Sequence, residues 1–153
     1  MATSDGIGSA EWDVGHELAV NIVNAPDLKK SRYRQQLLSY LDELEGRYGP
    51  LPSILATRAD YLDSDDPARQ ALLLQAHATA NARGDTANLL SSAQSLAELF
   101  LEMKRLREAD QWLTQMREHL NQFAHSDTDY SEYEELRAEY RKLAIRPAQP
   151  PAD

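Results

Sequence analysis

The sequence contains no cysteine among its 153 residues, which excludes a disulfide framework and thiolate chemistry. It also lacks an apolar run near the roughly 20 residues that a membrane-spanning helix needs. Its first residues, MATSDGIGSA, carry neither the basic nor the apolar region of a secretory signal. These absences lead us to expect a cytoplasmic protein that has no membrane partner.

Valine and isoleucine are scarce, and no segment alternates apolar and polar residues in the manner of a half-buried strand. Alanine, leucine, glutamate, glutamine and arginine dominate instead. Such side chains either have little rotamer freedom or lose little of it in a helix. The composition therefore predicts an all-α protein.

Basic residues are outnumbered by acidic ones, 16 to 25, and the formal net charge is −9. Proteins that bind nucleic acid need a basic face for the phosphates. An acidic surface instead promotes solubility and attracts basic partners. We therefore expect a basic protein or peptide partner and no nucleic acid. The oligomeric state stays open.

Apolar spacing and helix-breaking residues predict seven helices joined by short loops. Residues 1–9 are rich in glycine, serine and aspartate and are expected to be flexible, and the proline-rich residues 146–153 are expected to be a disordered tail. A single helical domain is predicted between them, over residues 10–145. The expected helices cover 10–24, 26–47, 52–62, 67–83, 86–104 and 106–123, and a seventh helix has Ser131 and Glu134 at capping-box spacing.

The stretch from Ser95 to Met116 places two apolar-striped helical runs on either side of Lys104-Arg105, a polar pair expected to cost nothing in an exposed turn. Tetratricopeptide repeats are helix–turn–helix units with large and small residues at fixed offsets. This stretch resembles one such repeat. The residues that carry the resemblance are Leu96, Ala97, Phe100, Ala109, Leu113 and Met116.

Two further Leu-Ala pairs, at Leu18-Ala19 and Leu55-Ala56, precede the pair at Leu96-Ala97 with spacings of 37 and 41 residues. A small residue follows each pair twelve positions later: Ser31, Ala68 and Ala109. The resemblance implies a short superhelical array of three antiparallel helical hairpins that the seventh helix closes. A generic helical bundle is the alternative, because Leu-Ala pairs are common.

The resemblance also implies a groove, lined in such arrays by the first helix of each hairpin. Its offsets give a polar, partly acidic set of candidate partner-binding residues. The candidates are His16, Val20, Val23, Asn24, Ser53, Thr57, Asp60, Tyr61, Ser91, Gln94, Glu98, Leu101 and Glu102.

Motifs for catalysis or metal binding are incomplete. The run HELAV begins as a zinc-protease helix does, but Val20 stands where the second histidine belongs. Asp127 and Asp129 resemble the start of a calcium loop, but Glu132 replaces its glycine. Arg83-Gly84-Asp85 is best interpreted as a helix-ending turn. We therefore expect no catalytic residue, metal or other cofactor.

Three functions remain open at this point. The first is a non-catalytic interaction module, an adaptor or scaffold, that binds a basic extended or helical segment. The second is an immunity or antitoxin-like inhibitor that occludes a partner enzyme. The third is a helical-bundle enzyme, which the incomplete motifs disfavour.

Overall fold

The computed structural model describes residues 2–123 and 126–145, and within these ranges it contains seven α-helices and no strand. The predicted all-α class is confirmed. The tail predicted at 146–153 lies outside the described residues. The helices are α1 (Ser9–Asn24), α2 (Asp27–Tyr48), α3 (Pro52–Asp60), α4 (Pro67–Arg83), α5 (Thr86–Glu102), α6 (Leu106–Gln122) and α7 (Asp127–Ile145).

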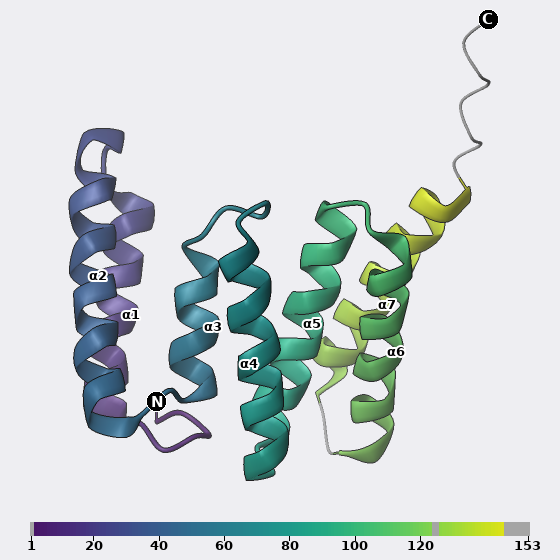
Figure 1. Ribbon diagram of the computed structural model, residues 1–153, viewed down its shortest axis with the longest axis horizontal. Helices are drawn as coiled ribbons and strands as arrows, with labels where there is room; N and C mark the ends of the chain where they lie inside the picture. Colours follow the sequence, from purple (N-terminus) through teal and green to yellow (C-terminus); the bar gives the residue numbers. More distant parts are fainter. Residues whose placement is uncertain (1, 124–125, 146–153) are drawn as a thin grey trace, which may run out of the picture. The chain divides into compact units, whose positions relative to one another are not determined.

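Residue contacts divide the chain into two compact units, residues 1–92 and residues 93–153, where the sequence suggested one domain. In the first unit α1 packs along α2, and α3 packs along α4 (Figure 1). In the second unit α6 packs along α7 (Figure 1). Helical hairpins make most of their contacts with sequence neighbours, so a chain of hairpins separates readily into such groups.

Several helix ends follow the signals that predicted them. The carboxylate of Asp66 accepts a hydrogen bond from the amide of Ala68 at 2.9 Å, and Pro67 occupies the first turn of α4. Gly84 has φ +66° and ends α4 in the left-handed conformation. The next residue, Asp85, caps α5 by accepting from the amide of Asn88 at 3.2 Å. The interpretation of Arg83-Gly84-Asp85 as a helix-ending turn is confirmed.

The joint at Lys104-Arg105 is more constrained than the sequence suggested. Lys104 has φ +57°, a left-handed conformation that glycine usually occupies. Its amide donates to the carbonyl of Leu101, and the amide of Arg105 donates to that of Phe100. These two bonds form a Schellman motif, and they partly offset the roughly 1–2 kcal/mol cost of a left-handed non-glycine residue. The expectation that the polar pair costs nothing here is therefore wrong.

The N-terminal segment was predicted to be flexible over residues 1–9. In the part that the structure describes, residues 2–9, it is instead anchored to the first unit. Ile7 is 0% exposed and belongs to the core formed by α1, α2 and α3. Asp5 accepts from the amide of Ser53 at 2.7 Å and so caps α3. Ser4 donates to Asp85 at 2.8 Å. The composition of the segment gave no indication that one isoleucine is deeply buried or that Ser4 and Asp5 form hydrogen bonds with residues distant in the sequence.

The seventh helix begins earlier than its predicted capping box. Ser126 and Asp129 form the capping box instead, because the amide of each donates a hydrogen bond to the side chain of the other, at 3.0 and 3.2 Å. Ser131 lies inside the helix. This difference also explains the acidic residues that resembled a calcium loop, since Asp127 and Asp129 stand in the first turn of α7, where negative charge complements the helix dipole.

The second unit is held together by a closely packed α6 and a polar clamp from α7. Ala109, Leu113 and Met116 are all buried on α6, as the repeat-like spacing predicted. Arg137 of α7 donates to Asp110 at 2.6 Å, and its guanidinium lies 5.3 Å from the ring centroid of Tyr140. The planar guanidinium can serve such an acceptor and ring together.

Candidate functional site

One face of α1 forms the first wall of the candidate site. Helical periodicity places residues at spacings of three and four on the same face. Trp12, Gly15, His16 and Ala19 all line one pocket in the first unit, and Val23 lies further along the same side of the helix. The sequence thus folds into a continuous stripe that is apolar except for His16.

The opposite wall comes from the C-terminal half of α3. Thr57, Asp60 and Tyr61 face the α1 stripe, and Leu37 and Leu41 of α2 complete the lining of a pocket of about 190 Å³. A 150 Å³ apolar cavity is known to hold a benzene ring. The pocket can therefore accommodate one large side chain.

A second pocket, of about 280 Å³, continues toward the end of α1. It is lined by His16, Ala19, Val20, Val23, Asn24 and Tyr61. The two pockets share His16, Ala19 and Tyr61, so they adjoin. We name this pair of adjoining pockets the α1–α3 groove.

Fixed contacts to α2 position both walls of the groove. The hydroxyl of Tyr40 donates to the carbonyl of Glu11 on α1 at 2.7 Å, and the carboxylate of Glu11 pairs with Arg47 and Tyr48 of α2. On α3, Arg58 makes an ion pair with Asp42 of α2 at 2.6 Å. The spacing of α1 and α3, which form the two walls of the groove, is therefore set by contacts that lie outside the groove.

The pKa of Tyr61 reflects the charges around the groove. Burial raises the pKa of its hydroxyl above the ordinary 10.0, and the negative charge of Asp60 raises this pKa further. The positive charge of Arg34 acts in the opposite direction. With its pKa raised, the Tyr61 hydroxyl stays neutral and able to donate a hydrogen bond at physiological pH.

The structure brings together most of the groove residues that the sequence predicted from the first two hairpins. Those that line the groove are His16, Val20, Val23, Asn24, Thr57, Asp60 and Tyr61. Ser53 is not among the lining residues of either pocket. Its amide is capped by Asp5, and its carbonyl accepts from Thr57 at 2.7 Å. Ser53 thus serves the start of α3.

The candidates on α5 do not line this groove. Ser91 is exposed in the first unit, whereas Gln94, Glu98 and Glu102 belong to the second. Gln94 donates to Glu98 at 3.0 Å. Leu101 is only 3% exposed, so it is a core residue. The expectation that Leu101 offers a contact surface is wrong, because that surface is already covered.

We call the pocket of about 190 Å³ the inner pocket of the groove. Sequence reasoning missed five of its lining residues: Trp12, Gly15, Ala19, Leu37 and Leu41. A signal for three of them was present. Trp12, Gly15 and Ala19 share a helical face with His16, and a glycine in mid-helix is unfavourable without a reason in packing or function. The two leucines belong to the apolar stripe of α2, and nothing in the sequence indicated that they line a pocket.

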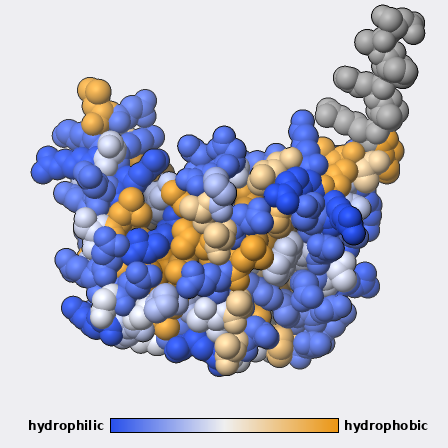
Figure 2. All heavy atoms as spheres, viewed as in Figure 1, coloured by the Kyte–Doolittle hydropathy of each residue, from blue (hydrophilic) through white to orange (hydrophobic). Residues whose placement is uncertain are grey.

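A second exposed feature lies at the turn between α1 and α2. Leu28 is 97% exposed and Val23 is 76% exposed. Figure 2 shows an isolated hydrophobic patch at that end of the hairpin, surrounded by hydrophilic surface. Lys29 and Arg32 follow in the first turns of α2, where positive charge opposes the helix dipole.

No helix within ranges 2–123 and 126–145 is both long and apolar enough to cross a bilayer. In the same ranges, no group of three or more histidine, cysteine, aspartate or glutamate residues could hold a metal ion.

The chain matches no protein-family model, no curated protein and no solved structure. The resemblance to tetratricopeptide repeats therefore stays a hypothesis that rests on the residues themselves.

Proposed function

We propose that this protein is a non-catalytic interaction module, an adaptor or scaffold, that binds a segment of another protein in the α1–α3 groove. The observation that carries the proposal is the groove itself. Residues predicted on two separate helices line two adjoining pockets that share His16 and Tyr61.

The side chains of the groove are better suited to binding a peptide than to catalysing a reaction. Val20 is 40% exposed and Val23 is 76% exposed, so apolar surface remains for a partner to cover. Removing apolar surface from water favours association. His16, Asn24 and Thr57 add hydrogen-bonding groups around this apolar surface, which orient a bound segment.

The arrangement of the first unit supports the repeat-like part of the proposal. α1 pairs with α2 and α3 pairs with α4, and the first helix of each pair lines the groove. Tetratricopeptide arrays use the first helix of each hairpin in the same way. We therefore propose a degenerate array of this kind, acting in the cytoplasm without a cofactor. Its partner is a basic protein segment, because the net charge is −9.

A random peptide library displayed on phage and panned on the whole chain tests the proposal. Selected peptides are then measured against Ala19→Phe, which fills the point where the two pockets meet, and against Ala78→Phe on the exposed side of α4. Circular dichroism first establishes that both variants keep the helical content of the wild type.

We expect Ala19→Phe to weaken binding of the selected peptides at least tenfold, and Ala78→Phe to leave it unchanged. An equal response to the two variants, or no selected peptide at all, contradicts the proposal. An inhibitor that occludes an enzyme would use one tight partner, so recovery of a single sequence family favours that function over an adaptor.

A further inference from the structure

The inner pocket of the α1–α3 groove combines aromatic walls with a carboxylate. Trp12 of α1 and Tyr61 at the end of α3 both line it, and Asp60 stands beside Tyr61. Aromatic faces attract cations through the quadrupole of the ring, with tryptophan the strongest. A nearby carboxylate adds a direct charge interaction.

Two of the segments that border the pocket, α1 and the turn after α3, carry an excess of acidic residues. Helix α1 carries Glu11, Asp13 and Glu17 and has no lysine or arginine. The turn after α3 adds Asp63 and Asp65 to Asp60. A positive group that enters between these segments is therefore attracted before it makes contact.

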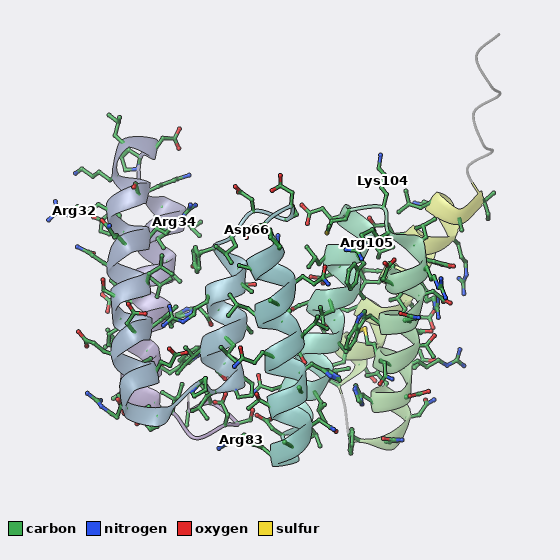
Figure 3. All side chains as sticks on the ribbon, viewed as in Figure 1. Arg32, Arg34, Asp66, Arg83, Lys104 and Arg105 are labelled. Carbon is green, nitrogen blue, oxygen red and sulfur yellow. The ribbon has the colours of Figure 1, made fainter. Side chains whose placement is uncertain are left out.

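One basic side chain of the chain itself approaches the same place. Arg34 of α2 lies on the side of the helix that faces α3, whereas Arg32 points the opposite way (Figure 3). The positive charge of Arg34 is close enough to lower the pKa of Tyr61 against the effect of Asp60. Arg34 thus modulates the charge that an entering group meets.

We propose that the inner pocket accepts a lysine or arginine side chain of the partner segment. The methylene stem packs on Ala19, and the charged head lies against Trp12, Tyr61 and Asp60. This inference rests on the proposed function, since it names the side chain that the groove would hold. It extends that function from a partner that is basic overall to one basic residue at one position.

The pocket has the size for this occupant. Its volume of about 190 Å³ exceeds that of a cavity that holds benzene, so a guanidinium with its stem fits. A purely apolar side chain of the same size would fill the space but gain nothing from the carboxylate. Cation–π contacts are worth about 0.5–1 kcal/mol at exposed sites and about 2 kcal/mol when desolvated.

Nuclear magnetic resonance of the ¹⁵N-labelled whole chain tests the inference with small probes. The probes are N-acetyl-arginine amide, its neutral isostere N-acetyl-citrulline amide, and N-acetyl-leucine amide. The chain has two tryptophans, so the indole signal of Trp12 reports on the pocket and that of Trp112 is an internal control. Each probe is titrated into the wild type, Asp60→Asn and Arg34→Gln.

We expect the arginine probe to shift the Trp12 signal and to bind about 3- to 10-fold tighter than citrulline, as expected for roughly 1 kcal/mol of charge interaction. Asp60→Asn should weaken the arginine probe by a similar factor and leave the leucine probe unchanged. Arg34→Gln should strengthen the arginine probe, because it removes a like charge.

Other outcomes overturn the inference in distinguishable ways. Equal binding of arginine, citrulline and leucine probes shows that the pocket takes a side chain without regard to charge, and the groove function stands. If Asp60→Asn strengthens binding of the arginine probe and Arg34→Gln weakens it, the reverse of the expectation, the pocket does not favour a positive charge. Absence of any Trp12 shift, together with selected peptides that ignore Ala19→Phe, overturns the groove function as well.

Discussion

The carboxylate of Asp5 accepts a hydrogen bond from the amide of Ser53 at 2.7 Å, across 48 positions of the sequence. This contact ties the N-terminal segment to the first turn of α3. Ile7, two residues further on, is 0% exposed in the core of the same unit. The segment therefore belongs to the structure that holds the groove walls in place.

Replacing Ile7 by alanine should lower the free energy of unfolding by about 2–5 kcal/mol, because a fully buried isoleucine is lost and a cavity remains. Urea denaturation followed by circular dichroism measures the change. Leu28→Ala is the matched control, since Leu28 is 97% exposed and its loss should change stability by less than about 0.5 kcal/mol. Similar effects from both would show that the N-terminal segment is not packed as described.

Replacing Gly15 by alanine should change stability and binding in opposite directions. A Cβ added there would lie 3.7 Å from the ring of Tyr40, an ordinary contact. Gly15→Ala should therefore stabilise the chain by about 0.5–1 kcal/mol, because glycine is unfavourable within a helix. Gly15 also lines the inner pocket, so we expect the variant to weaken binding of the arginine probe or of a selected peptide.

Gly46→Ala is its control. Gly46 lies in α2 with nothing within 4 Å of an added Cβ, and it is outside the lining of the groove. It should raise the melting midpoint to a similar extent and leave binding unchanged. If both glycine variants affect binding equally, Gly15 has no special place in the site.

The small residue of the repeat-like stretch, Ala109, is 0% exposed on α6. Ala109→Leu should overpack this position and reduce stability by about 1–3 kcal/mol. Ala138→Leu, on the exposed surface of α7, provides the comparison at a helical alanine in the same unit. A melting midpoint that Ala109→Leu leaves unchanged would mean that the packing register of this stretch is wrong.

Acidification should destabilise the chain through His119. Burial lowers the pKa of this imidazole below 6.5, although Glu118 partly offsets the effect. As the pH falls through 6.5, the unfolded chain binds a proton that the folded chain excludes, so the free energy of unfolding falls. The loss ends once the pH is below the folded pKa.

Denaturation midpoints of the wild type and His119→Gln between pH 7.5 and pH 5.5 measure this contribution. The wild type should lose more stability than the variant over that interval. If the denaturation midpoints of the two proteins change with pH in parallel, the pKa of His119 is the same in the folded and the unfolded chain.

The all-α class and most helix ends were predictable because they depend on local signals. Asp66, Gly84 and Gly49 act within a few residues of the ends that they mark. The role of Ile7 was not predictable, since it depends on contacts with α2 and α3 far along the chain. Lys104 adopts a conformation that its residue type does not signal.

The groove was predictable in part for the same reason. Helical periodicity and the repeat-like offsets identified seven of its lining residues, including His16, Thr57 and Tyr61. The offsets failed for Leu101, because the same spacing describes a buried face as readily as an exposed one. Leu37 and Leu41 of α2 were missed because a pocket floor formed by a third helix depends on tertiary packing.

The most direct test of the central claim is to map where a selected peptide binds on the ¹⁵N-labelled whole chain. Amide shift changes should concentrate in residues 12–24 of α1 and residues 57–61 at the end of α3, with a matching shift of the Trp12 indole, and Ala19→Phe should abolish them. Changes centred on α4, α6 or α7, or changes that persist in Ala19→Phe, would contradict the assignment of the α1–α3 groove as the binding site.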